Sequence, residues 1–356
     1  AKKALELQAE NADAHVILGQ VALSREQRDA ARPELEKAIE LDPKNVQAHL
    51  ALASLAFQKG EFDKSLELYK KAVELDPKSV QALAGLGEVY LSKNLVDEAV
   101  DAAQKILAAL PPADDQTPVS QEEVGARFIL GRAYLLKASG IETQDAAGAK
   151  ALYEKAVAEL EKVTAAVQNI PSANYSLGIA CSKVGKFQQA IEQFLLVLQA
   201  DSGNISTLQN LAIAYFQENQ YDAAIEYAKK LIALDANNLT GHKLLLDAYL
   251  RTNNVAQAQE LLAKIETLDP SDPVLAINKA IVALQGRDFA QAIAQAEASL
   301  ASGQENAFVY NILGRAQAGT NEFEKAEAAL KKAVELSPKL LSARLALADV
   351  YVKTQK

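Results

Sequence analysis

Hydrophobic residues recur along the chain in paired clusters with a period of 34 residues. Within each period, the apolar residues of each cluster fall on one face of a helix, because their spacing follows the 3.6-residue helical turn. A leucine followed by glycine or alanine marks the first cluster at Leu18, Leu52, Leu86, Leu177, Leu211, Leu313 and Leu347. This pattern predicts pairs of short helices of about 12 to 14 residues each.

Each period can be numbered from Ala12 as place 1, restarting at residues 46, 80, 124, 171, 205, 239, 273 and 307. Place 20 holds alanine or serine in every period except the one that starts at 124, and place 11 often holds a tyrosine. Small residues at places 8 and 20 let two helices approach closely. Several periods end in a segment such as Leu41-Asp42-Pro43, where the proline ends the second helix because it lacks an N–H donor. A single helix pair cannot bury its own apolar face, so neighbouring pairs must stack.

These residues resemble the tetratricopeptide repeat family over essentially the whole chain. The family's tryptophan at place 4 is missing, and His15, His49 and His242 are among the residues that stand there. The resemblance implies an all-α fold, a right-handed α-solenoid of stacked helix-turn-helix repeats.

The register of the period divides the chain into segments. Residues 1–11 are expected to end a preceding second helix, and 12–113 to form repeats 1–3. An inserted loop is expected at 114–123, followed by repeat 4 at 124–170 with an enlarged turn at 138–150, alone or together with an extension of the second helix at its start. Repeats 5–9 span 171–340. Residues 341–356 form the first helix of a further repeat or a capping helix, and we expect the chain to be part of a longer array.

Composition narrows the class of partner. The 37 basic and 46 acidic residues give a net charge of −9, which disfavours nucleic acid and anionic membranes. No stretch approaches the roughly 18 apolar residues of a membrane span, so no direct membrane insertion is expected. The single cysteine, Cys181, stands at place 11 and is predicted to be a buried thiol.

The sequence offers little for catalysis. All three histidines stand at place 4, where a packing role is expected, and no third ligand joins them at the spacing of a zinc site. No glycine-rich phosphate-binding loop is present. We therefore predict no metal, no cofactor and no enzymatic activity.

The resemblance implies that places 2, 5, 9, 12 and 13 of the first helices line a concave groove. In repeats four to eight these places carry a candidate apolar strip, which is either a partner site or packing against the next repeat. Lys243, Asp247 and Arg251 recur every four residues beside it as a candidate charged ladder. The predicted partner-binding residues are Phe128, Arg132, Tyr175, Ile179, Ile213, Phe216, Lys243, Asp247, Leu250, Arg251, Ile277 and Ile281.

The leading hypothesis is a non-catalytic scaffold that binds an extended peptide or a helix of a partner protein in this groove. One alternative is a structural subunit that self-associates end to end. The other is a segment that delivers substrates to a larger enzyme. The chain resembles long arrays of bacterial origin, an analogy that favours a periplasmic or cell-envelope location over the cytoplasm.

Overall fold

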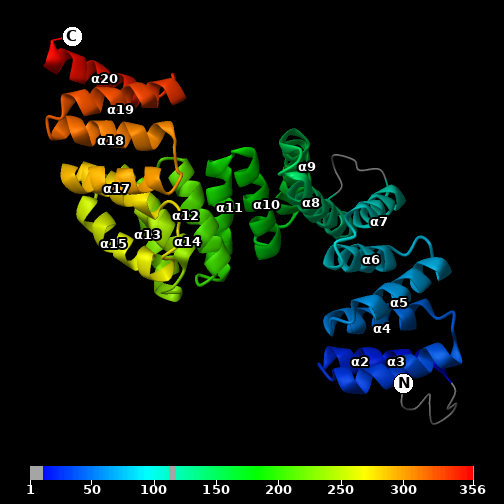
Figure 1. Ribbon diagram of the computed structural model, residues 1–356. Helices are drawn as coiled ribbons and strands as arrows, with labels where there is room; N and C mark the ends of the chain where they lie inside the picture. Colours follow the sequence, from blue (N-terminus) through cyan, green and yellow to red (C-terminus); the bar gives the residue numbers. More distant parts are fainter. Residues whose placement is uncertain (1–10, 112–117, 356) are drawn as a thin grey trace. The chain divides into compact units, whose positions relative to one another are not determined.

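The computed structural model describes residues 11–111 and 118–355, and this part of the chain is helical without any β-strand (Figure 1). Two compact units divide it, residues 1–202 and residues 203–356. The segments expected at residues 1–10 and at 114–117 of the insertion lie outside the described residues. Helix pairs stacked in chain order make the protein an all-α solenoid of helical repeats.

Unit 1 contains five helix pairs among its described residues. The helices are α2 (Ala12–Ser24), α3 (Arg28–Leu41), α4 (Val46–Gln58), α5 (Phe62–Leu75), α6 (Val80–Ser92), α7 (Val96–Ala109), α8 (Gln121–Ile141), α9 (Ala146–Ala166), α10 (Pro171–Val184) and α11 (Phe187–Ala200). Within the unit, each helix packs on the helices before and after it, and successive first helices also touch. This is the stacking that buries one apolar face of each pair.

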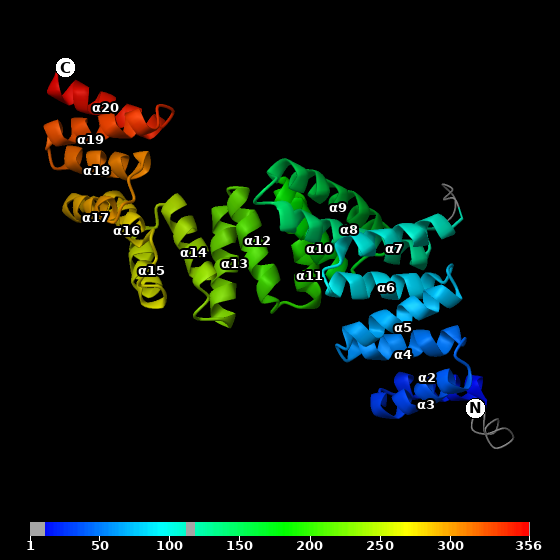
Figure 2. The same ribbon diagram turned by 45° about the vertical axis from the view of Figure 1, so that its right-hand side comes forward.

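Unit 2 continues the pattern with four pairs and one further helix (Figure 2). The helices are α12 (Ile205–Gln217), α13 (Tyr221–Leu234), α14 (Leu239–Arg251), α15 (Val255–Leu268), α16 (Leu275–Gln285), α17 (Phe289–Ala301), α18 (Ala307–Gly319), α19 (Phe323–Leu336) and α20 (Leu341–Thr354). Second helices such as α13 and α15 end at the leucine that precedes Asp. Proline follows α15 two residues later, but α13 ends at the same place without a proline, so the proline is not required for this end.

Glycine at place 8 sets the distance between the two helices of a pair. A Cβ on Gly19 would lie 2.6 Å from the side chain of Leu35, and one on Gly314 would lie 2.6 Å from Leu330. Both leucines come from the second helix of the same repeat and are fully buried. The predicted close approach is therefore present in these two repeats, where an added Cβ would collide with the leucine.

Just after most first helices, the residue at place 15 adopts the left-handed backbone conformation. Positive φ angles occur at Glu26 (59°), Asn94 (57°), Arg287 (60°) and Asn321 (64°), and glycine takes the same place at Gly60. The following N–H then donates to the carbonyl of place 11, five residues earlier, as in Gln27 N to Ala22 O at 2.9 Å. This backbone closure satisfies a carbonyl that the helix end would otherwise leave free.

Repeat 4 differs from the expected enlarged turn at residues 138–150. The extra residues are helical, because α8 runs to Ile141 and α9 begins at Ala146, and each is 21 residues long. Only residues 142–145 form the turn. Alanine-rich sequence favours helix here, and Asp145 caps α9 by accepting the N–H of Gly148 at 2.8 Å. The insertion lengthened the helices instead of the loop.

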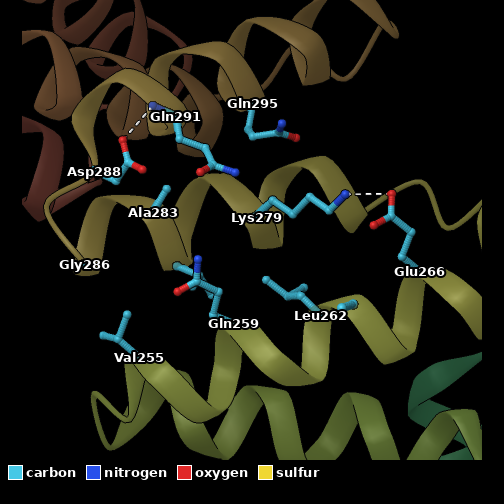
Figure 3. A pocket seen from close by; sticks show the side chains of 12 residues that line it. Val255, Gln259, Leu262, Glu266, Lys279, Ala283, Gly286, Asp288, Gln291 and Gln295 are labelled. Carbon is cyan, nitrogen blue, oxygen red and sulfur yellow. Dashed lines mark hydrogen bonds and ion pairs between the residues drawn. The ribbon is translucent and has the colours of Figure 1, made fainter.

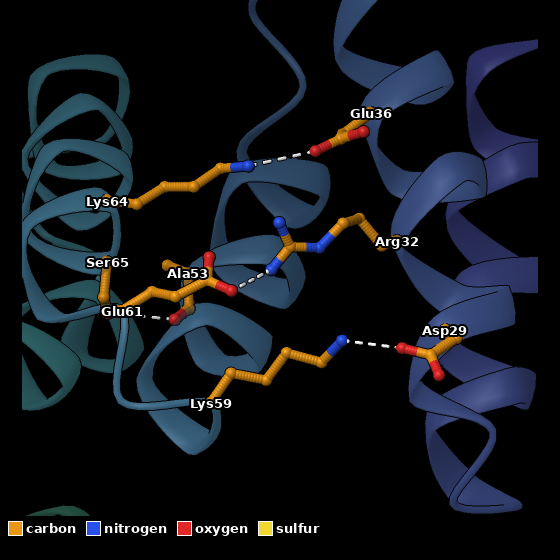
Figure 4. A network of polar contacts seen from close by, with 8 residues as sticks. All are labelled: Asp29, Arg32, Glu36, Ala53, Lys59, Glu61, Lys64 and Ser65. Atoms are coloured by element: carbon orange, nitrogen blue, oxygen red, sulfur yellow. Dashed lines mark hydrogen bonds and ion pairs between the residues drawn. The ribbon is translucent and has the colours of Figure 1, made fainter.

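Ion pairs link neighbouring repeats of unit 1 (Figure 4). Lys59 contacts Asp29 at 2.8 Å, and Lys64 contacts Glu36 at 3.0 Å. The first of these recurs one period later between Lys93 and Asp63. Ser65, at the small place 20, donates its hydroxyl hydrogen to the carbonyl of Ala53 at 2.9 Å inside the core. The repeats are thus joined by apolar packing in the core and by solvent-exposed charges at the rim.

Candidate functional site

A cavity in unit 2 is formed mainly by first helices. It has a volume of about 810 Å³ and is lined by the C-terminal turns of α16 and α18 and by one face of α20. Its lining residues stand mainly at the places predicted to face a groove, namely 2, 5, 9, 12 and 13. They are Asn253, Leu284, Gln285, Arg287, Phe289, Arg315, Ala318, Gly319, Ser342, Leu345, Ala346, Asp349 and Lys353. A volume of this size lies within the range of about 300–1,000 Å³ typical of ligand pockets.

Positive charge predominates in this cavity, although the chain as a whole is acidic. Lys353 forms an ion pair with Asp349 at 2.9 Å. Arg287 and Arg315 are exposed, and neither makes an ion pair with any of the described residues. A guanidinium without a protein partner retains all of its donors for a carboxylate or another acceptor.

Apolar surface lies beside these arginines. Leu345 of α20 is 61% exposed, and Leu284 of α16 is partly buried at the same cavity. Gly319 ends α18 so close to Phe289 that a Cβ would lie 2.6 Å from the ring. That approach keeps one end of the cavity narrow and lined by an aromatic ring. The cavity therefore offers charged donors and an apolar wall together.

The predicted residues of unit 1 lie on α8 and α10 and are mostly engaged within the chain. Phe128 packs against a buried cluster of Val124, Val163 and Ala173. The Arg132 guanidinium contacts Glu88 at 2.7 Å and lies 5.3 Å from the centroid of the Phe128 ring.

The other two predicted residues of unit 1 are partly buried. The ring of Tyr175 lies 6.0 Å from that of the buried Phe194, measured between centroids. Ile179 is also half-buried. Partner binding at these four positions stays a prediction.

The predicted apolar residues of unit 2 are partly buried as well. Leu250 packs against the cluster around α14 and α15, and Ile277 and Ile281 pack against the cluster around α16 and α18. Phe216 makes an edge contact with Tyr221, with ring centroids 5.4 Å apart, and Ile213 is half-buried. For Leu250, Ile277 and Ile281, these contacts favour the alternative interpretation, packing between repeats.

The predicted charged ladder on α14 is only partly assembled. Lys243 pairs with the buried Asp272 at 2.9 Å, in the loop before α16. Desolvation by the surrounding protein raises the pKa of the Asp247 carboxyl, although the charges of Arg251 and Lys243 oppose that rise. Lys243 thus holds the loop 269–274 and is less available to a partner than the sequence suggested.

The histidines and the cysteine have structural surroundings. His49 and His242 each lie 3.0 Å from a backbone carbonyl oxygen six residues earlier, and His15 contacts Glu34 at 2.6 Å. Cys181 is fully buried, as predicted, and burial raises its pKa to about 12. Across the described residues, no cluster of three or more His, Cys, Asp or Glu side chains could hold a metal ion. No described helix is long and apolar enough to span a membrane.

None of the residues that line this cavity is among the predicted partner-binding residues, which were drawn mostly from an apolar strip in repeats four to eight. Arg315 and Asp349 stand at place 9, and Leu345 stands at place 5, so the place rule already pointed to them. Arg287 and Arg315 could not be recognised from sequence as candidates, because only the structure shows which basic side chains already form ion pairs within the chain.

The sequence signature of the tetratricopeptide repeat matches residues 1–46, 18–80, 50–114 and 277–340, and a second signature of the same repeat matches 215–277. The chain belongs to the tetratricopeptide repeat family. Tetratricopeptide repeats indicate a scaffold for protein–protein interaction. No curated protein sequence matches the chain.

Solved structures show the same fold. Pseudomonas aeruginosa pilF is 23% identical, with 66% of this chain and 97% of that chain aligned at a TM-score of 0.53. PilW, described as a widely conserved type IV pilus biogenesis factor, is 20% identical, with 62% and 92% aligned at a TM-score of 0.50. At these identities the likeness concerns the fold of the tetratricopeptide repeats.

Proposed function

We propose that this tetratricopeptide repeat protein is a scaffold that binds an acidic, partly apolar segment of a partner protein on its first helices. The observation that carries the proposal is the pair of unpartnered arginines, Arg287 and Arg315, in the cavity bounded by α16, α18 and α20. Their charge contrasts with the acidic balance of the whole chain. A local positive site on an acidic protein selects for acidic groups at short range.

The chemistry of the cavity suits a carboxylate that follows an apolar side chain. Arginine presents its donors in a planar fork that matches both oxygens of a carboxylate. Leu345, exposed beside the arginines, offers a contact for an aliphatic side chain of the same segment. An extended peptide with alternating apolar and acidic residues can reach both features.

Peptide binding tests the proposal directly. A fluorescein-labelled peptide of alternating leucine and glutamate is compared with a leucine–lysine peptide of equal length by fluorescence anisotropy. We expect the acidic peptide to bind and Arg315→Glu to weaken it about tenfold or more, since a charge-assisted contact is lost and a like charge faces the peptide. Added salt weakens the same binding because it screens exposed charges.

Arg344→Glu is the matched control. Arg344 is an exposed arginine of α20 that does not line the cavity, so its reversal changes net charge equally. We expect it to alter affinity by no more than about twofold. Equal binding of the basic peptide, or equal effects of the two reversals, would contradict the proposal.

A second candidate function is self-association, favoured by the surface of α20. Leu341, Leu345 and Val352 lie on one helical face and are 63%, 61% and 77% exposed. An apolar stripe of this kind on a helix suits another apolar surface, including that of a second copy. Light scattering over a concentration series tests it. Growth in mass that is lost in Leu341→Ser combined with Val352→Ser supports self-association, and a constant monomer mass excludes it.

A further inference from the structure

Place 2 of the repeat changes character in repeats 8 and 9, where it holds Val274 and Phe308. Place 2 is one of the places predicted to line a groove on the first helices. In the seven preceding repeats it holds a polar residue or glycine, namely Asp13, Gln47, Gln81, Gly125, Ser172, Ser206 and Thr240. Val274 and Phe308 are named here the apolar pair.

Packing within the chain does not account for the apolar pair. The residue at place 2 is exposed in every repeat except repeat 4, where Gly125 is partly buried. Val274 is 42% exposed and Phe308 is 47% exposed. Helices precede and follow both residues, so neither belongs to a terminal helix of the described array. Apolar side chains that the core leaves uncovered, gathered on one surface, indicate contact with another molecule.

The apolar pair lies beside the arginine-lined cavity. Phe308 and Arg315 are seven residues apart on α18, which is two helical turns, so they share one face and lie about 10 Å apart along the axis. Arg287 follows the C-terminal end of α16, which touches α18. Apolar surface thus lies toward the N-terminal ends of these two helices, and unpaired positive charge lies toward their C-terminal ends.

A cleft between the second helices α15 and α17 does not offer the same combination (Figure 3). It has a volume of about 290 Å³ and an apolar floor that includes Leu262. Lys279, its one basic lining residue, contacts Glu266 at 2.7 Å, and the carboxylate of Asp288 also lines the cleft. An acidic segment would find no unpaired cation there. The surface of the first helices is therefore the one that suits such a segment.

The spacing of the first helices selects the conformation of the segment. Packed helices have axes about 8–10 Å apart, so residues at place 2 of adjacent repeats recur at about that distance. In an extended strand, side chains on one face recur about every 6.7 Å, and the next repetition is at about 13 Å. In an α-helix, residues seven apart lie on one face about 10.5 Å apart. A helix can therefore place one apolar residue on each member of the apolar pair, whereas a strand does not match the spacing.

The width of a helix fits the same surface. An α-helix with its side chains is about 10–12 Å across, which is comparable to the distance along α18 between Phe308 and Arg315. A helix that contacts Phe308 through an apolar stripe presents its flank to Arg315. Acidic residues on that flank meet the donors of the guanidinium group. Amphipathic helices bind grooves in this way, with apolar residues at helical spacing as anchors.

We propose that the acidic partner segment binds as an amphipathic helix laid across α16 and α18. Apolar residues seven positions apart contact the apolar pair, and an acidic flank faces the two arginines of the cavity. This inference rests on the proposed function, because it specifies the conformation of the same partner. The arginines alone accept either an extended segment or a helix, and the apolar pair adds the preference for the helix.

Two fluorescein-labelled peptides with the same content of leucine, glutamate and alanine test the inference. In the first, leucines recur at helical spacing with glutamates along one flank, and in the second, leucine and glutamate alternate as in a strand. We expect the first to bind about tenfold more tightly in fluorescence anisotropy. Carbon-13 shifts of its labelled Cα atoms should show helix in the complex. A central proline should reduce its affinity to that of the second peptide, because proline breaks a helix.

Phe308→Ser removes the larger member of the apolar pair. Because Phe308 is exposed, the variant should fold, and we expect it to bind the helical peptide about tenfold more weakly, since apolar burial is lost. Ile205→Ser is the matched control. Ile205 begins α12, is 43% exposed and does not line the arginine-lined cavity. We expect it to change affinity by no more than about twofold.

Several results would overturn the inference. If both peptides bind equally and both lose affinity in Arg315→Glu, the proposed function stands and the helix is excluded. If neither peptide binds, the proposed function fails as well. Equal effects of Phe308→Ser and Ile205→Ser would show that the apolar pair is not part of the site. Self-association of the protein that is lost in Phe308→Ser would assign the apolar pair to a second copy instead.

Discussion

Gly178 of α10 lies so close to Phe194 of α11 that a Cβ on the glycine would stand 2.5 Å from the ring. Phe194 is completely buried, and Tyr175 packs against its ring from the same first helix. The ring has no free space to move into. This pair fixes the separation of the two helices of repeat 5.

Gly178→Ala should therefore destabilise the protein by about 1–3 kcal/mol, because the added methyl forces the ring or the helix to shift. Urea unfolding followed by circular dichroism measures the change. Gly125→Ala is the matched control, since Gly125 lies inside α8 with nothing within 4 Å of an added Cβ. There we expect a gain of about 0.5–1 kcal/mol from helix propensity. Equal effects at the two glycines would contradict the packing argument.

Glu26→Gly should stabilise repeat 1. Glu26 has a φ of 59°, a conformation that costs a residue with a Cβ about 1–2 kcal/mol. Glycine adopts it freely, so we expect a gain of about 1 kcal/mol in the free energy of unfolding. Gly60→Ala makes the reverse change at the same place one repeat later, where φ is 75°, and should lose a similar amount. A lower free energy of unfolding in Glu26→Gly would mean that contacts of the Glu26 side chain contribute more to stability than its backbone conformation costs.

Cys181 should be almost unreactive in the folded protein. Burial raises its pKa to about 12, with Lys186 opposing that rise and Glu161 adding to it. At pH 8 only about 1 in 10,000 thiols would be ionised, and the thiolate is the reactive form. Ellman's reagent should therefore modify native protein slowly and urea-unfolded protein fully. Rapid modification of the native state would contradict the buried placement.

Glu142 should stabilise the turn between α8 and α9 at neutral pH and lose that effect in acid. Lys183 holds the pKa of its carboxyl below the usual value, and Tyr153 adds a hydrogen bond of 3.0 Å. A carboxyl with a lowered folded pKa contributes stability above its unfolded pKa of about 4.3, and the contribution is lost as pH falls through the folded pKa.

Glu142→Gln measures this contribution. We expect the variant to be less stable than the wild type at pH 7, with a difference that shrinks below about pH 4. Glu154→Gln on α9 is the control, because Glu154 is exposed and has no ion pair among the described residues. A difference for Glu142→Gln that is constant with pH would point to packing instead of charge.

The fold could be predicted from sequence alone because the same residue types recur at the same places of each repeat. Gly19 and Gly314 stand where close helix approach requires them, and Leu-Asp-Pro segments end second helices as expected. The enlarged turn predicted for repeat 4 was wrong, since helix propensity around Ala146 outweighed the glycines, whereas the extension of the second helix at its start is present. Period counting fixes where residues are added but not which conformation they take.

The candidate site was harder to predict from sequence. Ile277 and Ile281 stand at groove places, yet they pack against a core cluster that includes residues of the next repeat, and such contacts between repeats are not visible in the sequence. Arg315 became a candidate only once its lack of an ion pair was known. The prediction that partners bind at Ile179 and Ile213 still stands for experiment, as does the predicted cell-envelope location.

The contacts between Lys59 and Asp29, and between Lys93 and Asp63, each join one repeat to the next and never skip a neighbour. Because each repeat contacts only its neighbours, the stability of the chain is approximately a sum over single repeats and the interfaces between adjacent ones. The loss of one such interface therefore weakens the two repeats that share it and leaves the distant repeats unchanged.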